Sequence, residues 1–216
     1  MTISLADQAY QILEDKIVRL EYQPGALISE KQLSDELGIG RMPIREAIKR
    51  LEQAHLIRIM PRRGMMVTEI KLDEILLQTE VRRVLERLIV RRASRYANDE
   101  QRSQLMSLAD EYEAATVEND ANESMRVDNE FNHLVAECAM NPYATASIMP
   151  LHALARRLYY FYYGREDALI VKINMAHVNL MKAIANSHED EAVTLSDHLV
   201  DLILELYKKH YFQLLD

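Results

Sequence analysis

The chain has 216 residues and a mass of 25.1 kDa, which is enough for one large domain or two small ones. It is 49% hydrophobic and 28% charged with only 5 Gly and 5 Pro, which excludes disordered, collagen-like and low-complexity classes. Its net charge of −8, taken as an average, argues against a nucleic-acid partner.

Three further features narrow the class of protein. The single cysteine, Cys138, excludes a disulfide framework and a cysteine-rich zinc site. The longest apolar runs are far shorter than the roughly 18 residues that a membrane span needs. No charged-then-apolar signal segment opens the sequence. We therefore expect a cytoplasmic protein without a membrane partner.

The first seventy residues predict three helices. Apolar residues recur at helical spacing over residues 5–20. After the Pro24-Gly25 turn, Ser29 and Gln32 form the pattern of a capping box that opens a short helix to Leu37. Gly38-Ile39-Gly40 ends that helix, and Pro43 suits the first turn of a third helix that runs to about Ala54.

A hairpin follows the third helix. Two short apolar runs, 57–60 and 65–68, flank the polar turn 61–64, and the whole order of elements is that of a winged helix-turn-helix. In this motif the third helix lies in the major groove, where arginines at its N-terminal end reach base edges or phosphates. Arg62 and Arg63, at the tip of the wing, would lie near the minor groove or the backbone.

The distribution of charge supports this interpretation. Residues 1–68 carry 10 Lys and Arg against 9 Asp and Glu, whereas residues 69–216 carry 16 against 25. Within 41–63, seven basic residues stand against two acidic ones. A local basic face determines phosphate binding more than the net charge does. A solvated helix face is the alternative explanation for these charges.

Several spaced motifs resemble the GntR family of bacterial transcription regulators. The segment 24–33 resembles PGxxLxExxLA, the segment 37–47 resembles LGVSRTPVREAL, and Arg63-Gly64 with Val67 resembles the wing ending RGxxV. The resemblance implies that Arg41 and Arg45 make the main base and phosphate contacts and that Lys31 supports them. It also implies that Gly64 lets the wing backbone approach the duplex. The full set of DNA-binding residues that it implies is Lys31, Arg41, Met42, Arg45, Arg62, Arg63 and Gly64.

Two departures from the family pattern affect this interface. Gly40 and Met42 replace a Ser and a Thr, which removes two hydroxyls that could donate to phosphate. His55 stands where the family often has a Gly after the third helix. We expect an atypical operator sequence and an unchanged fold.

From Leu72 onward the pattern is helical to the end. We expect about six helices: 72–96, 99–118, 123–140, 144–163, 167–186 and 189–211. The predicted fold class is therefore mainly α, with a winged helix-turn-helix DNA-binding domain in residues 1–70 and an all-helical domain in residues 71–216.

Four polar residues of the helical domain occupy positions beside or on apolar stripes. Asp128 and Asn132 lie one helical turn apart, His177 falls on the stripe of its helix, and His198 neighbours Leu195, Leu199 and Leu202. A divalent cation is one way to satisfy several buried polar groups, and ordinary hydrogen bonding within the core is the other.

The helical domain resembles the FCD (FadR C-terminal domain) group of GntR regulators. The segment 128–142 resembles the pattern DxxFH…NP, the segment 80–86 resembles ExRxxLE, and His177 and His198 match the last two metal-ligating histidines. The resemblance implies a zinc, nickel or manganese ion held by Asp128, Asn132, His177 and His198. Asn132 replaces a family His, so we expect weaker binding that favours harder cations.

The same resemblance implies a small carboxylate effector. Arg82 is the expected second anchor, because a guanidinium pairs with both oxygens of a carboxylate; a surface helix charge is its alternative explanation. The aromatic run 159–163 fits a ligand site, core packing or a dimer contact.

These features predict a ligand-responsive transcription regulator that binds a palindromic operator as a homodimer, since one recognition helix reads one half-site. Whether the ligand releases or tightens DNA stays open. One alternative is a metal-free protein whose helical domain only dimerises. Another is an enzyme in which two His and one carboxylate hold iron, although no acid or base is paired with that site.

Overall fold

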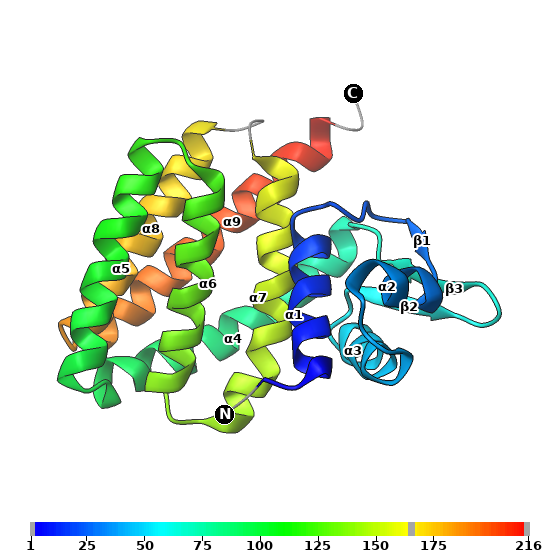
Figure 1. The fold of residues 1–216 in the computed structure, drawn as a ribbon. Coiled ribbons are helices and arrows are strands. Elements are labelled where there is room, and N and C mark those ends of the chain that lie inside the picture. The colour runs from blue at the N-terminus through cyan, green and yellow to red at the C-terminus, as the bar shows by residue number, and fades with distance from the viewer. Residues whose placement is uncertain (1–2, 164–166, 214–216) are drawn as a thin grey trace. The chain divides into compact units, whose positions relative to one another are not determined.

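The computed structural model describes residues 3–163 and 167–213 (Figure 1). Within these ranges it contains nine helices and three strands. The mainly helical class, with a small sheet in the N-terminal part, confirms the prediction from sequence. The chain divides into two compact units: residues 1–71 with 153–161, and residues 72–152 with 162–216. Segment 153–161, which the sequence assigns to the helical domain, thus groups with the first unit.

In the first unit, three helices precede a hairpin. Helix α1 spans Leu5–Val18, α2 spans Glu30–Leu37 and α3 spans Arg41–Gln53. The Ser29 side chain caps α2 by accepting a hydrogen bond from the Gln32 amide, and Gly38 ends the helix in the left-handed conformation, φ +63°. Helices α1 and α2 both pack against α3, so the recognition helix is fixed from two sides.

The wing is a three-stranded antiparallel sheet of order β1-β3-β2. Strand β2 is Ile57–Met60 and β3 is Gly64–Val67, as the two apolar runs predict. Strand β1, the two residues Leu27–Ile28, pairs with Met66 and Met65 of β3 and is absent from the sequence-based assignment. A two-residue strand carries too little alternation to be recognised in a sequence.

Five whole helices belong to the second unit: α4, Leu72–Tyr96; α5, Asp99–Val117; α6, Ala121–Cys138; α8, Asp167–Ala185; and α9, Glu189–Gln213. Helix α7, Pro142–Tyr162, is divided, because its residues 153–161 group with the first unit. Helix α5 packs against α6 and α8, and α4 packs against α6, α8 and α9. The fully buried side chains of this unit are large, which shows that the helices enclose a common core: Ile89, Leu105, Tyr112, Ile148, Leu180 and Met181.

Helix α8 contains the one stretch of the described residues that is long and apolar enough to cross a membrane. Residues 168–185 have the length and mean hydropathy of a membrane span even though the stretch includes Lys172 and Lys182, and 67% of it is buried inside the protein. The lengths of the apolar runs in the sequence predict no such stretch. A helix at the centre of a bundle meets the same criteria, because it is apolar around most of its circumference.

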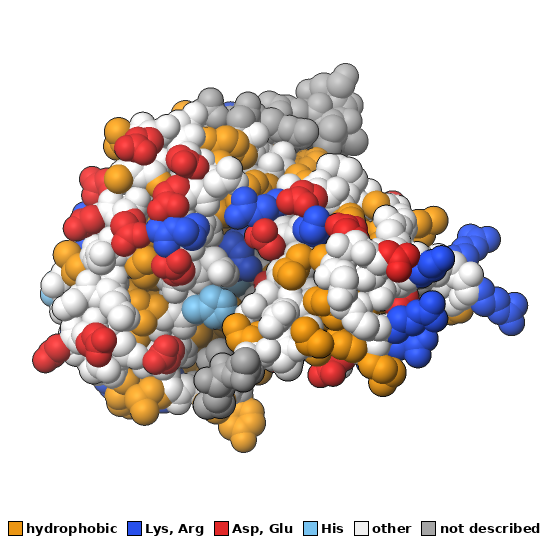
Figure 2. Space-filling model, in the orientation of Figure 1, with side chains coloured by type: hydrophobic (Ala, Val, Ile, Leu, Met, Phe, Trp, Pro, Cys, Tyr) orange, Lys and Arg blue, Asp and Glu red, His pale blue; other side chains and the backbone are white. Residues whose placement is uncertain are grey.

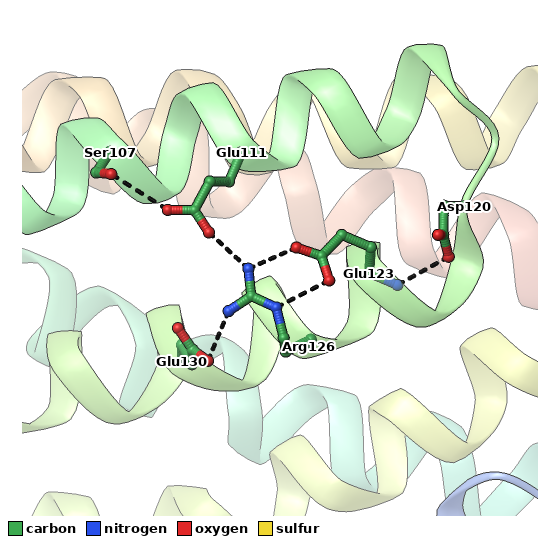
Figure 3. Close-up of polar contacts among 6 residues, drawn as sticks. All are labelled: Ser107, Glu111, Asp120, Glu123, Arg126 and Glu130. Carbon is green, nitrogen blue, oxygen red and sulfur yellow. Dashed lines mark hydrogen bonds and ion pairs between the residues drawn. The ribbon is translucent and has the colours of Figure 1, made fainter.

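An ion-pair network joins α6 to α5 (Figure 3). The Arg126 guanidinium contacts the carboxylates of Glu111, Glu123 and Glu130, at N–O distances of 2.5, 2.6 and 2.6 Å. Asp120 caps the start of α6 by accepting from the Glu123 amide. These contacts hold the N-terminal half of α6, which carries Asp128, against its neighbour.

Candidate functional site

The recognition helix presents a line of cations on its exposed side. Ile44, Ala47, Ile48 and Leu51 of α3 are buried, and Arg41, Arg45 and Lys49 lie one turn apart on the opposite face. Met42 is 73% exposed beside them, where an apolar side chain can contact a thymine methyl. This arrangement can place cationic and apolar groups on phosphates and base edges together.

The start of α3 is open to an anion. Gly40 is the N-cap and supplies no side-chain hydrogen bond to the first turn. The first amides of the helix, which a Ser at this position would partly satisfy, therefore face outward with the positive end of the helix dipole. The loss of the family serine leaves backbone donors for phosphate in its place.

Two of the basic residues on α3 already have protein partners. The Arg45 Nε contacts both carboxylate oxygens of Glu30 on α2, at 2.8 and 2.9 Å, and this exposed pair directs the guanidinium. This neighbour also raises the pKa of Arg45. Arg50 instead donates to Asp7 of α1 at 2.7 Å and stacks on Tyr10, 4.3 Å from the ring centre. Arg50 therefore fixes α1 to α3.

The wing carries the rest of the basic surface. Arg62 and Arg63 are exposed in the turn between β2 and β3, Arg62 with a φ of +66°, and Lys31 is exposed on α2. Figure 2 shows basic side chains gathered at the β2–β3 end of the first unit. Gly64 has a φ of +93°, and a Cβ there would lie 2.6 Å from the Ile28 carbonyl oxygen, so its glycine is required by the sheet itself.

In the second unit, Arg82 is buried. It is 7% exposed on α4, and its Nε donates to Glu86 Oε1 at 3.0 Å. This placement rules out the surface-charge explanation. Among the described residues Glu86 is its hydrogen-bonding partner, so the terminal nitrogens of the guanidinium remain for a second acceptor.

His152 of α7 completes this group, and the sequence analysis does not identify it. Its Nε2 lies 2.9 Å from Glu86 Oε1, and its buried Nδ1 has no hydrogen-bond partner within the described residues. Burial raises the pKa of Glu86, but His152 and Arg82 outweigh it and hold that pKa at about 2. The ionised carboxylate only accepts, so His152 Nε2 donates to it, and Nδ1 is the ring nitrogen that remains for another partner.

Three of the four predicted metal ligands come together in a buried cluster. His177 Nε2 lies 3.2 Å from Asp128 Oδ1, and Asn132 Nδ2 donates to Asp128 Oδ2 at 2.9 Å. The rings of Tyr112 and Phe131 lie beside His177, with centres 5.4 and 6.4 Å away. Burial lowers the pKa of Arg82, but the nearby Glu86 carboxylate outweighs it and the net shift is upward. The charge of Asp128 adds a smaller contribution in the same direction.

His198 does not join this cluster. Its side chain is exposed, and the described residues contain no group of three or more His, Cys, Asp or Glu side chains able to hold a metal. The buried residues of α9 near His198 are Ser196, Leu199, Val200, Leu202 and Ile203. Of the apolar residues that neighbour His198 in the sequence, Leu199 and Leu202 are buried as expected, but His198 itself lies on the exposed side of the helix.

The cluster nevertheless provides three suitable donors for a cation. The Ile173 carbonyl accepts from His177 Nδ1 at 2.9 Å, so Nε2 faces the Asp128 carboxylate as the second ring nitrogen. A cation held between Nε2 and the carboxylate would have both groups as ligands, with the Ile173 carbonyl fixing the orientation of the ring. Asn132 can present Oδ1 to the same position by turning its amide. The residues thus fit a three-ligand site and do not fit the four-ligand set.

Comparison with known proteins places the chain in a family. The family model described as "Bacterial regulatory proteins, gntR family" matches residues 5–67, and the FCD domain model matches residues 78–202. The chain belongs to the gntR family of bacterial transcription regulators and carries the FCD domain.

Individual relatives agree with this assignment. The HTH-type transcriptional repressor RspR of Escherichia coli is 29% identical over 196 residues, which cover 90% of this chain and 86% of that protein. The Nta operon transcriptional regulator of Aminobacter aminovorans is 22% identical over 200 residues, which cover 92% and 89%.

Two solved structures share the fold. The E. coli protein McbR/YncC has a TM-score of 0.84 at 19% identity, covering 97% of this chain and 100% of that chain. A GntR regulator from Rhodococcus sp. RHA1 has a TM-score of 0.71 at 20% identity, covering 93% and 96%.

Proposed function

We propose that this regulator binds a palindromic operator in the cytoplasm as a homodimer and responds to a small carboxylate held in its helical unit. The observation that supports operator binding most strongly is the line Arg41–Arg45–Lys49, exposed on a helix whose opposite face is buried. The uncapped start of α3 and the basic wing add donors for the DNA backbone.

Two arginines on α3 give a matched test of this interface. Arg45→Ala lowers affinity for a genomic fragment retained by the full-length protein by about 10- to 100-fold, because it removes a contact worth about 1–3 kcal/mol. Arg50→Ala, on the same helix, changes affinity less than about threefold, because Arg50 is directed to Asp7 and Tyr10. Fluorescence anisotropy measures both. Equal losses in the two variants would contradict the assignment of the face.

The arrangement around Glu86 supports a hydroxy-carboxylate effector. Arg82 offers its terminal nitrogens to a carboxylate, and His152 Nδ1 has no hydrogen-bond partner among the described residues. Both side chains share Glu86 Oε1, at 3.0 and 2.9 Å, so they are close neighbours. In an acid with a hydroxyl beside its carboxylate, the carboxylate pairs with Arg82 and the hydroxyl forms a hydrogen bond with His152 Nδ1.

A thermal-shift series tests this chemistry. We expect glycolate, lactate and malate to raise Tm more than acetate, propionate and succinate, which lack the hydroxyl. Arg82→Lys abolishes the shift, because an ammonium cannot pair with both carboxylate oxygens. Arg126→Lys, at the surface network of α6, leaves the shift unchanged. Equal shifts for the two series of acids would exclude the role of His152, and an unchanged shift in Arg82→Lys would exclude the anchor.

A divalent cation is the third part of the proposal, and Asp128, Asn132 and His177 would hold it. Such an ion supplies a positive charge with open positions for a carboxylate. Because an amide is a weaker ligand than imidazole, Asn132→His raises zinc and nickel affinity above that of the wild type. Calorimetric titration after chelation measures the affinities. No uptake by either protein would remove the cation, and the Arg82 anchor does not depend on it.

Differential binding links the two activities. An effector that binds one arrangement of the dimer better than another shifts the population of arrangements, and operator affinity changes with it. Anisotropy with and without lactate measures the sign of this coupling.

A further inference from the structure

Helix α4 exposes an apolar line on the side that faces away from its own unit. The exposed fractions of its four members are 66, 54, 65 and 43%, in the order Leu77, Val81, Val84 and Leu88. Their spacing of four, three and four residues places them on one stripe along the helix.

The stripe is not needed to pack α4 against its neighbours. Helices α6, α8 and α9 cover the other side, on which Ile75, Ile89, Val90 and Ala93 are buried. Exposure of a contiguous stripe of large aliphatic side chains to water is unfavourable, and such a stripe indicates a surface that another molecule covers.

The stripe has the symmetry of a two-fold contact. Leu77 and Leu88 lie equally far from the midpoint of the stripe, and so do Val81 and Val84. Beyond the stripe, Glu74 and Arg91 are exposed at equal distances on the same side; Arg91 contacts Asp190 of α9 at 3.2 Å, and 49% of its side chain stays exposed. Two copies crossing antiparallel thus bring leucine to leucine, valine to valine, and the acidic end of one helix to the basic end of the other.

We propose that a second copy of this chain covers the stripe, with the two α4 helices antiparallel. This rests on the homodimer of the proposed function and assigns its contact surface. A parallel pairing would bring Glu74 against Glu74 and Arg91 against Arg91, whereas the antiparallel pairing forms two ion pairs. The stripe is about 16 Å long, at 1.5 Å per residue, and forms the apolar centre of the contact. Exposed Glu80 and Arg87 on its flanks belong to the polar rim.

The antiparallel register gives a charge-exchange test in the full-length protein. Light scattering coupled to gel filtration measures the mass. Val81→Glu and Val84→Lys, each alone, put a charge against a valine of the partner and weaken the dimer at least 10-fold. In the double variant V81E/V84K, the carboxylate introduced at position 81 meets the ammonium introduced at position 84 of the other copy, and the dimer returns. Val171→Glu, at a valine of α8 that is 44% exposed, is the control and stays dimeric.

Each outcome decides one point. A wild-type monomer overturns both the homodimer and this surface. A wild-type dimer with a dimeric Val81→Glu variant overturns the surface alone, which includes the case in which the first unit of the same chain covers the stripe. Two monomeric single variants with a monomeric double variant overturn the antiparallel register. Unchanged circular dichroism in each variant shows that a change in mass is not a loss of folding.

Discussion

At the scale of the residue, His55 is held in a conformation that favours glycine. It follows the recognition helix with a φ of +59°, and its side chain is exposed. Its carbonyl accepts from Thr68 Oγ1 at 2.8 Å, so the backbone position is fixed by the residue that follows β3. The sequence singles out this position because the family often has glycine there, and the backbone supplies the physical reason.

Replacing His55 therefore tests the strain directly. We expect His55→Gly to raise the free energy of unfolding of the first unit by about 0.5–1 kcal/mol. Glycine removes the steric cost of the left-handed conformation, but it also increases the conformational entropy of the unfolded chain, which offsets part of the gain. His55→Ala keeps the Cβ and gives no increase. Urea unfolding measures both. An equal gain from alanine would show that the side chain, and not the φ angle, carries the strain.

Glu86 makes stability depend on acid. Its pKa in the folded protein is about 2, below the usual 4.5, so the ionised form stabilises the fold above about pH 4.5. That contribution is lost as the pH falls toward 2, because the folded protein then binds the proton less readily than the unfolded chain does.

Glu86→Gln removes this titration. The variant should unfold more easily at pH 7 by about 2–3 kcal/mol, since it leaves Arg82 buried without its carboxylate. The difference from the wild type should narrow between pH 4.5 and pH 3. Urea midpoints at pH 7, 4.5 and 3 measure it, and a constant difference across this range would contradict the role of the carboxylate charge.

The buried polar residues show how far the sequence predicts the site. Asp128, Asn132 and His177 are predicted from their positions on helices and lie together. His152 follows the buried Ile148 by one turn, the same signal as for His177, and could have been identified. His198 is exposed although Leu199 and Leu202 beside it are buried, because consecutive residues point about 100° apart around a helix and His198 lies just outside the buried stripe.

At the scale of the element, helix caps explain why the predicted boundaries agree with the structure. Ser29 begins α2, and Asn98 begins α5 with a capping box completed by Gln101. Helix α6 begins at Ala121 behind its cap Asp120, ahead of the predicted start at Glu123. Local hydrogen bonds of this kind can be recognised in a sequence. Strand β1 has no such signal, because its pairing with β3 joins residues almost forty positions apart.

The Arg126 network predicts a measurable link between α5 and α6. Arg126→Ala leaves three carboxylates near one another without a cation, so we expect a loss of about 1 kcal/mol at low salt and a smaller loss at 1 M salt. Lys182→Ala, which breaks the single exposed pair with Glu113 between α8 and α5, should cost less. Urea unfolding at two salt concentrations makes the comparison. An unchanged Arg126→Ala protein would show that the network contributes nothing.

At the scale of the whole molecule, the net charge of −8 hides two surfaces with different roles. The acidic excess belongs to residues 69–216, and the exposed cations of α3 and the wing gather on the first unit (Figure 2). Phosphate contacts displace counterions, so operator affinity should fall steeply as salt rises despite the overall negative charge. The distribution of charge along the sequence predicts this property, and the average does not.

The central claim is that a dimer presents two copies of α3 to a two-fold symmetric site. Selection of binding sequences from a random duplex pool by the full-length protein, followed by sequencing, tests it most directly. The account predicts enrichment of an inverted repeat with half-site centres about one helical turn, or a multiple of it, apart, and no enrichment by Arg45→Ala. Enrichment of a single unrepeated site, or of the same repeat by Arg45→Ala, would contradict it.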